Sequence, residues 1–501
     1  MAEVQREQWG SRLAIIIAAI SMAVGTGNIW RFPRVAAEWG GGTFLFAVTV
    51  GLLVWAIPLL MCEFLMGSRS RLANIGAFRD FMGPRNSWMG AFMACVTVGI
   101  MFYYAVVAGW TVRYLWATLP VVGDGIGADV DGQAFWDEFI SNPLETVGFH
   151  AAAVLFAAVV VYRGIKGGLE RVLKVLLPAL LVILVILAFR AITLPGAEEG
   201  LRYLFIPEWS LLAEPRIWLE ALTQVAWSTG AGWGLLMVYS IYARKNEDVA
   251  VNSGIIAFSD VLVGFLAAAI ALGTLFAIAP TVDFAQEALA EGDHDGLIFI
   301  YLVELLASMP GGVVLAPLFF FALALAGVSS LIAMFELATA NLMNFGVQRR
   351  QAAVYVGLAA FAFGIPSALN LTFLRNQDWV WGVGLLISGL LTAMAILKYG
   401  VDRARRDVNE TSDVHLGAWW SYLVRFVPVV FIVIFGWWMY QSVTDFSEAW
   451  WNPLEPFSTG TMLLQWGVVF VIVYLLNGFF NRKVARGPMT KKGQGRDVVK
   501  S

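Results

Sequence analysis

A few oxygen-bearing side chains stand isolated within long apolar stretches of this chain. They are Asn28, Ser228, Asp260, Ser329 and Ser330. Small hard cations need several oxygen ligands, which amides, hydroxyls and carboxylates supply. A serine in an apolar helix more often bonds to the carbonyl four residues earlier, so the serines alone do not identify a site. A carboxylate inside such a helix is costly unless it is paired, which makes Asp260 a functional candidate.

Two of the apolar stretches are interrupted by glycines near their middle. Between Arg12 and Arg31 the chain runs eighteen residues without a charge, and residues 24–28, Val-Gly-Thr-Gly-Asn, lie at its centre. Residues 228–234 place three glycines at alternate positions in a second run. In a membrane, backbone freed from a helix persists only where protein, water or ions satisfy it. The two breaks together predict a ligand site at mid-bilayer, whereas either break alone is also compatible with close glycine-mediated helix packing.

The chemistry of such breaks is largely electrostatic. The N-terminus of a half-helix presents free N–H groups that suit a carboxylate, and the freed carbonyls at a C-terminus suit a cation or an ammonium group. A zwitterion fits both ends. Two interrupted spans that lie five helices apart are what an inverted five-plus-five repeat produces, with substrate and ions held at the bilayer midplane.

The composition is that of a polytopic membrane protein. The chain is 59% hydrophobic and only 14% charged, and apolar runs long enough to cross a bilayer recur along it. The uncharged stretches fall near residues 13–30, 39–62, 86–112, 146–162, 175–189, 221–243, 261–282, 305–335, 351–374, 379–397, 426–444 and 456–481. We therefore predict an all-α transmembrane fold of twelve helices, with spans 1–5 and 6–10 as the inverted repeat and spans 1 and 6 broken.

This count divides the chain into four parts. We expect a cytoplasmic N-terminus at residues 1–10, a ten-helix inverted-repeat transport core at 11–400, helices 11 and 12 at 401–482 and a basic cytoplasmic tail at 483–501. The two cysteines lie inside predicted spans, and the three histidines fit no metal or triad spacing. No enzyme motif is found.

The distribution of charge predicts the orientation, because short loops rich in Lys and Arg stay on the cytoplasmic side. Basic residues gather after the even-numbered spans, whereas the loops after spans 3 and 7 are acidic. We expect a multi-pass protein of the plasma (inner) membrane with both termini in the cytoplasm. The net charge of −3 gives no indication of a nucleic-acid partner, and the lipid bilayer is the expected surroundings.

Several motifs carry a resemblance to a known family. Residues 6–12, 24–33 and 38–42 resemble the first helix of the neurotransmitter:sodium symporter family and the start of its second. The similarity continues through residues 103–110 of span 3, 224–234 of span 6 and 326–330 of span 8, and covers about the first ten spans. It implies a leucine-transporter-like fold and Na⁺-coupled symport of an amino acid or a related compound by alternating access.

The resemblance also implies two sodium ions. The first site would use the Ala23 carbonyl with Asn28, Ser228 and the carboxylate of the bound substrate. The second would use the carbonyls of Ser21, Val24 and Ala326 with the hydroxyls of Ser329 and Ser330.

By the same mapping, a substrate pocket is formed from spans 1, 3, 6 and 8. Its residues would be Val24, Gly25, Thr26, Gly27, Ile100, Tyr104, Trp227, Ser228, Gly230, Trp233, Ser330 and Met334. Tyr104 would bind the substrate carboxylate and Trp227 would form an outer lid. Gly25 stands where the monoamine carriers of the family place an aspartate, so the substrate should bring its own carboxylate. Ile100 and Met334 give an apolar wall, which favours a neutral, hydrophobic amino acid.

The sequence departs from the family pattern at several positions. Chloride-dependent members use a tyrosine in span 2 and a serine in span 7, where this chain has Val48 and Asp260. We predict that Asp260 replaces chloride, with proton counter-movement as a further possibility. Ile256 falls where an asparagine sodium ligand is expected, so Asp260 is also a candidate ligand of sodium 1.

The gates are expected from the same resemblance. Arg31 and Asp378 would close the outer side, and Arg6 and Trp9 belong to the inner gate, where the expected aspartate of span 8 is Asn344. A sensor that binds an amino acid without transporting it would share this site, and it remains the alternative to a symporter. The gate residues favour transport.

Overall fold

The computed structural model describes residues 7–119, 130–278, 299, 300, 303, 306, 311–444, 448–485 and 487–489. Within these ranges every long element is a helix. The first half contains α1 (Arg12–Ala23), α2 (Thr26–Ile29), α3 (Arg31–Glu38), α4 (Gly42–Gly51), α5 (Ile57–Ser70), α6 (Asn74–Met82), α7 (Ser87–Thr118), α8 (Gly132–Ile140), α9 (Pro143–Tyr162), α10 (Glu170–Ile192) and α11 (Ala197–Phe205). The second contains α12 (Pro215–Ser228), α13 (Leu235–Ile241), α14 (Val249–Ile278), α17 (Gly312–Asn344), α18 (Arg349–Leu369), α19 (Leu371–Tyr399), α20 (Val401–Asn409), α21 (Ala418–Thr444), α22 (Thr459–Leu475) and α23 (Asn477–Lys483).

Several helix ends follow from local capping. Ser11 accepts a hydrogen bond from Ala14 N at the start of α1, and Asn370 accepts one from Phe373 N at the start of α19. Short π-helical turns, Leu52–Ala56 and Ile165–Leu169, lead into α5 and α10. Each joins its neighbouring helix into one long span.

Nine helices in the described ranges are long and apolar enough to cross a membrane, and the number rises to 11 if each of two bent pairs is one span. One bent pair is Arg12–Ala23 with Thr26–Glu38, at an angle of 59°. Helices α12 and α13 are separated by residues 229–234, and each is too short to cross a membrane alone. The twelve-span count therefore stays a prediction.

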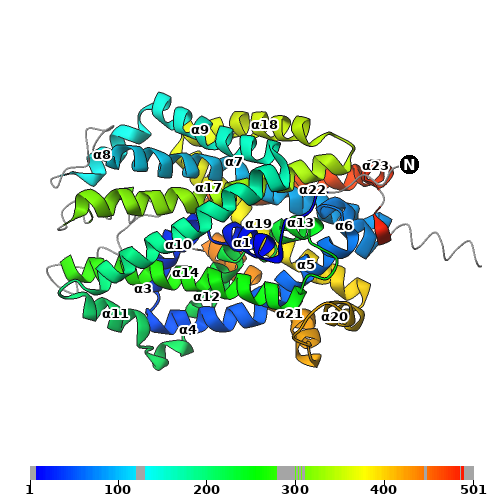
Figure 1. The fold of residues 1–501 in the computed structure, drawn as a ribbon, viewed down its shortest axis with the longest axis horizontal. Coiled ribbons are helices and arrows are strands. Elements are labelled where there is room, and N and C mark those ends of the chain that lie inside the picture. The colour runs from blue at the N-terminus through cyan, green and yellow to red at the C-terminus, as the bar shows by residue number, and fades with distance from the viewer. Residues whose placement is uncertain are drawn as a thin grey trace, which may run out of the picture.

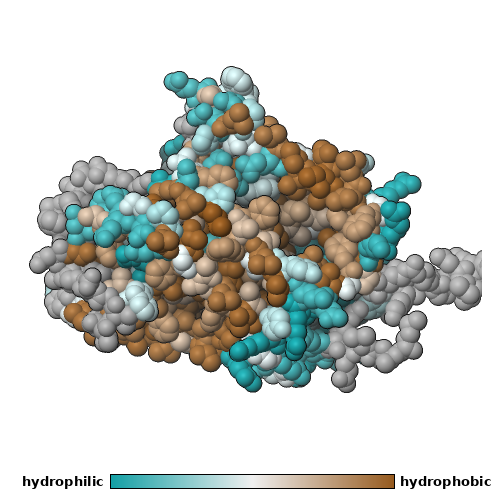
Figure 2. All heavy atoms as spheres, turned by 90° about the horizontal axis from the view of Figure 1, so that it is seen from above, coloured by the Kyte–Doolittle hydropathy of each residue, from teal (hydrophilic) through white to brown (hydrophobic). Residues whose placement is uncertain are grey.

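The helices run side by side along the long axis of the molecule (Figure 1). The N-terminus, α6, α20 and α23 lie at one end, and α3, α8 and α11 lie at the other. Figure 2 shows hydrophobic residues gathered mainly across the middle of one face, with hydrophilic residues toward its ends. This is the surface that a bilayer-spanning bundle requires.

The core of the bundle is built around α17. In its most apolar 18-residue stretch, 89% of α17 is buried, against 22% for α21. Helix α17 packs against α7, α10 and α9. The broken segments α1, α2 and α13 also contact α17. Helices α21 and α22 pack outside this core, against α19 and α7. The interrupted helices thus lie against the most buried helix.

The segment between α14 and α17 lies mostly outside the described residues. Phe299 is described, and it is 1% exposed. Its carbonyl accepts a hydrogen bond from Tyr114 Oη at 2.8 Å, and its ring stacks on Trp136 at 5.5 Å.

Candidate functional site

A cavity of about 650 Å³ opens from the breaks in α1–α2 and α12–α13. Most of the predicted site residues line it: Ala23, Gly25, Thr26, Gly27, Asn28, Arg31, Tyr104, Trp227, Ser228, Gly230, Trp233, Ser330, Met334 and Asp378. The remaining described candidates are not in its wall: Trp9, Ser21, Val24, Ile100, Asp260, Ala326 and Ser329. All seven are buried behind it. Arg6 lies outside the described residues.

The break after α1 is two residues long. Val24 and Gly25 are extended, and α2 begins at Thr26. The Gly25 N–H donates to Asn28 Oδ1 at 2.9 Å, and Thr26 donates to Tyr104 Oη from its N–H at 3.3 Å and its hydroxyl at 3.2 Å. Tyr104, a side chain of α7, thereby accepts a backbone hydrogen bond that a carbonyl would accept in a continuous helix.

Gly25 has no room for a side chain. A methyl group there would lie 2.8 Å from Ser330 Oγ and 3.2 Å from Tyr104 Oη. An aspartate at this position would require both neighbours to move. A substrate that binds here meets the Tyr104 hydroxyl and exposed peptide groups instead of a fixed carboxylate.

A carboxylate from α14, outside the cavity wall, bonds two side chains of that wall. Asn28 Nδ2 donates to Asp260 Oδ1 at 2.6 Å and to the Asp260 carbonyl at 3.0 Å. Ser228 Oγ donates to Asp260 Oδ2 at 2.8 Å. Asp260 is fully buried, as is Ile256 one turn earlier. One carboxylate thus connects both broken helices, because it bonds one side chain from each.

The two serines predicted for the second sodium site have different hydrogen-bond partners. Ser330 Oγ lies 3.3 Å from the Met22 carbonyl and 3.4 Å from the Val24 carbonyl, joining α17 to the end of α1. Ser329 Oγ donates to the Ala326 carbonyl of its own helix at 3.0 Å. In the part of the chain that is described, no group of three His, Cys, Asp or Glu side chains is placed to hold a metal. A cation here would have to be bound largely by carbonyl, hydroxyl and amide oxygens.

The break after α12 is longer and is anchored from α5. Gly230, Gly232 and Gly234 have φ values of +73°, +94° and +76°, a region that glycine adopts without steric penalty. The Glu63 carboxylate accepts hydrogen bonds from the N–H groups of Gly232 at 2.8 Å, Gly234 at 3.0 Å and Met237 at 3.4 Å. Glu63 therefore caps the start of α13.

The predicted outer pairing of Arg31 with Asp378 is not made in this structure. Arg31 hydrogen-bonds Gln224 and lies 3.6 Å from Glu220, both on α12. Asp378 instead accepts a hydrogen bond from Tyr103 Oη at 2.9 Å. Both residues line the cavity, and each has a different partner. Glu220 was not foreseen as a partner, since an acid at the start of span 6 has no sequence pattern that points to Arg31.

Trp9, predicted for the inner gate, is 1% exposed and donates from Nε1 to the Tyr239 carbonyl at 2.9 Å. The nearby charges come from residues that the sequence did not identify as a group. Arg349 pairs with Glu336 at 2.6 Å and with Glu7 at 2.9 Å. Asn344 Nδ2 is buried without a hydrogen-bond partner.

Comparison with known proteins agrees with this architecture. The profile of the sodium:neurotransmitter symporter family matches residues 6–122 and 141–482. The chain therefore belongs to this family, and it is a multi-pass membrane transporter with homologues that depend on sodium.

Individual relatives span nearly the whole chain. An uncharacterized sodium-dependent transporter of Methanocaldococcus jannaschii is 31% identical over 452 residues, which cover 87% of this chain and 90% of that protein. The sodium-dependent serotonin transporter of Drosophila melanogaster is 26% identical, covering 96% and 84%. The crystal structure of MhsT in complex with L-phenylalanine superposes with a TM-score of 0.75 at 30% identity, covering 86% of this chain and 99% of MhsT.

Proposed function

We propose that this protein is a sodium-coupled symporter that imports a neutral, hydrophobic amino acid by alternating access. The observation that carries the proposal is the bonding of Asn28 and Ser228, one from each broken helix, to the single carboxylate of Asp260. Asn28 and Ser228 line the cavity, and Asn28 accepts a hydrogen bond from Gly25, which has no room for a substituent. Sodium and a zwitterionic substrate would bind the polar groups that the breaks leave without helical partners.

The substrate proposal rests on the walls of the cavity. The carboxylate would bind near Tyr104 and the peptide groups at Gly25 and Gly27. Trp227 and Trp233 meet edge to face, with ring centroids 5.7 Å apart, and Met334 lies on the same cavity. Such a wall suits an apolar or aromatic side chain. MhsT was crystallised with L-phenylalanine, which supports this substrate class.

We propose two sodium sites. The first would combine the Ala23 carbonyl, Asn28, Ser228 and the substrate carboxylate, with Asp260 as a direct ligand or immediate counter-charge. Ile256 offers no oxygen from the same helix, and Asp260 already lies within hydrogen-bond distance of both side-chain ligands. The second would use Ser21, Val24, Ala326, Ser329 and Ser330. Ser330 already contacts the Val24 carbonyl, which favours this position.

Asp260 is proposed to make transport independent of chloride. A fixed negative charge beside the first sodium supplies what a bound anion would otherwise supply. Asp260→Ser should therefore make sodium-dependent uptake require chloride. Uptake by this variant that stays equally high in gluconate and chloride would refute the role.

The membrane arrangement completes the proposal. Counting α12 and α13 as one span gives twelve spans, with an inverted repeat over the first ten. The end that carries the N-terminus, α20 and α23 would face the cytoplasm, in agreement with the basic loops. The cavity would then open to the outside.

Transport in proteoliposomes tests the proposal against an amino-acid sensor. The purified protein should accumulate at least one neutral amino acid from a panel of the standard amino acids when an inward sodium gradient is imposed, and not with choline. Counterflow should occur with the same substrate. Sodium-dependent binding without accumulation or counterflow would instead identify a sensor.

A further inference from the structure

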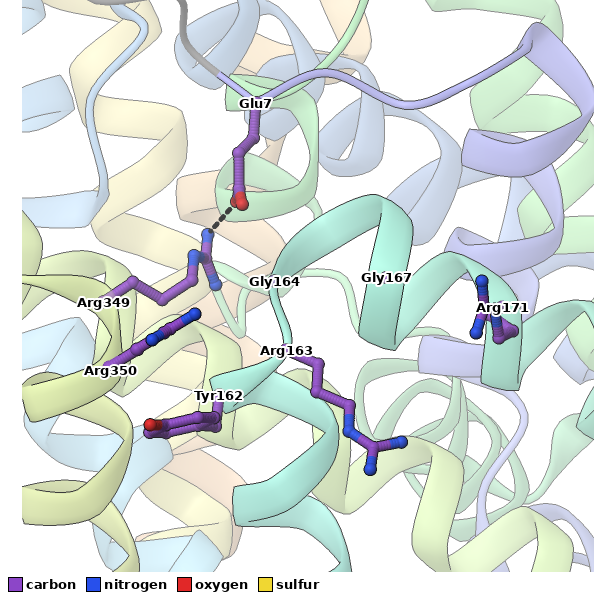
Figure 3. A pocket seen from close by; sticks show the side chains of 8 residues that line it. All are labelled: Glu7, Tyr162, Arg163, Gly164, Gly167, Arg171, Arg349 and Arg350. Atoms are coloured by element: carbon purple, nitrogen blue, oxygen red, sulfur yellow. Dashed lines mark ion pairs between the residues drawn. The ribbon is translucent and has the colours of Figure 1, made fainter.

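A second cavity, of about 480 Å³, lies at the end of the molecule that carries the N-terminus. It is bounded by the end of α9, the start of α10 and the start of α18 (Figure 3), and it shares no lining residue with the cavity of about 650 Å³. Its wall contains four arginines and one carboxylate, Glu7, so the formal charge of its lining is +3. A strongly positive cavity calls for an anion.

Two of the arginines come from the first turn of α18. The Arg350 guanidinium lies over the Tyr162 ring, 5.4 Å from its centroid, and Figure 3 shows the two stacked. The Arg349 side chain is only 10% exposed, and its Nε is buried without a hydrogen-bond partner. Glu7 and Glu336 hold the other nitrogens of Arg349. One arginine is thus oriented by an aromatic ring, and the other retains an unused donor.

The other two arginines come from the connection between α9 and α10. In the described part of the chain, Arg163 and Arg171 make no ion pair with a carboxylate, which leaves both guanidinium groups available. Arginine presents its N–H groups in a planar fork that matches the oxygens of a phosphate group.

The backbone of this connection adds a further anion-binding feature. Gly164 has φ +81° and precedes the helical span Ile165–Ile192 without giving it a side-chain cap. A methyl group at Gly167 would meet no atom within 4 Å. A methyl group at Gly164 would collide with Glu7 Oε1, so one carboxylate already lies at the start of this long helix, and such an end favours negative charge.

The surface beside the cavity is apolar. Leu155 and Val159 of α9 and Val354 and Leu358 of α18 are 65%, 41%, 47% and 63% exposed. These two helices pack against each other, so the four side chains lie on the outer surface of one helix pair. A phospholipid could place its acyl chains along this surface and its headgroup at the arginines.

We propose that this cavity binds a phosphate group, supplied either by the headgroup of an anionic phospholipid or by free phosphate. The site shares no lining residue with the proposed substrate cavity and does not depend on the proposed substrate, although Glu7 and Arg349 also belong to the charged group near Trp9. Both sources offer the same oxygens to the arginine forks. The adjacent apolar surface matches the lipid.

Two binding measurements on the purified full-length protein test the site and distinguish the sources. In the first, inorganic phosphate is titrated at constant sodium and ionic strength, with gluconate as the comparison anion, and thermal stability is recorded. In the second, the protein is placed in nanodiscs of phosphatidylcholine alone or of equal parts phosphatidylcholine and phosphatidylglycerol, and lipid retention is measured by native mass spectrometry.

The variants are Arg163→Gln and Arg350→Gln, with Arg425→Gln as the matched control. Arg425 is a half-exposed arginine that pairs with Asp402 on another part of the chain. Each cavity variant should weaken binding about tenfold, the loss expected for one charge-assisted hydrogen bond, and the control should bind like the unsubstituted protein. Unaltered melting temperatures without ligand would show that the variants are folded.

Each result has a defined meaning. Loss of phosphatidylglycerol retention in the cavity variants supports a lipid site, and loss of stabilisation by phosphate alone supports a site for the free ion. Equal binding in all three variants, or binding of neither ligand by the unsubstituted protein, would overturn the proposal.

Discussion

The two breaks that border the cavity of about 650 Å³ are stabilised in different ways. At the first, residues 24–25, the freed groups are met by the side chains of Asn28 and Tyr104. At the second, residues 229–234, the backbone N–H groups converge on the carboxylate of Glu63. The first set of side chains lines the cavity, whereas Glu63 does not.

This difference suggests two roles: the first break can exchange its hydrogen bonds for bonds to a ligand, whereas the second holds a fixed backbone conformation. Asn28 and Tyr104 line a cavity that a ligand can enter, so a ligand can replace or join their hydrogen bonds. Glu63 accepts three backbone hydrogen bonds from a position with no exposed surface. We therefore expect substitutions at the second break to affect folding, and substitutions at the first to affect ligand binding.

The largest expected effect comes from Glu63→Ala. The substitution leaves three buried N–H groups without an acceptor, and each such group costs about 1–3 kcal/mol. Thermal unfolding of the purified protein should show a severe loss of stability. Glu63→Gln retains one acceptor oxygen and should lose less. A Glu63→Ala protein that melts with the unsubstituted one would show that the second break needs no anchor.

Gly234→Ala should give the next largest loss. Its φ of +76° disfavours any other residue by about 1–2 kcal/mol, and the added methyl group would lie 2.1 Å from Asn74 Nδ2. The matched control is Gly254→Ala within α14, where a methyl group meets no atom within 4 Å. The control should be neutral or stabilised by up to about 1 kcal/mol. Equal melting temperatures for both variants would contradict the conformation assigned to residues 229–234.

Tyr104→Phe should have the smallest effect on folding. It removes one hydroxyl that Thr26 bonds twice, a net contribution of about 1 kcal/mol to stability. Substrate affinity should fall about tenfold, because the proposed carboxylate partner is lost. Isothermal titration in sodium measures the affinity, and thermal unfolding measures the stability. A variant that loses stability but keeps its affinity would place the substrate elsewhere.

The places where the helices break could be predicted from local composition. Glycines at residues 25, 27, 230, 232 and 234 interrupt uncharged runs, and the structure ends α1 at Ala23 and α12 at Ser228. A glycine permits backbone conformations that interrupt a helix, and its position can be read directly from the sequence. The oxygens of Asn28, Ser228 and Asp260 were also recognisable, because polar side chains are rare in apolar spans.

The partners of the charged residues could not be predicted in the same way. The bonds of Glu63 to the backbone of residues 232–237 depend on how α5 and α13 pack, which leaves no motif in the sequence. Arg31 was assigned to Asp378, whereas the structure gives it Glu220. That choice depends on how α3, α12 and α19 pack in three dimensions, which the sequence does not display. The group formed by Glu7, Arg349 and Glu336 could not be predicted either, because its members come from three different segments.

Sodium-dependent binding by Asn28→Leu tests the central claim most directly. Thermal stabilisation by each standard amino acid is measured in sodium and in choline, for this variant and for the unsubstituted protein. We predict that the unsubstituted protein is stabilised by a neutral, apolar amino acid in sodium only, and that Asn28→Leu is stabilised in neither salt although it remains folded. Full stabilisation in choline, or unchanged sodium-dependent stabilisation of Asn28→Leu, would contradict the account.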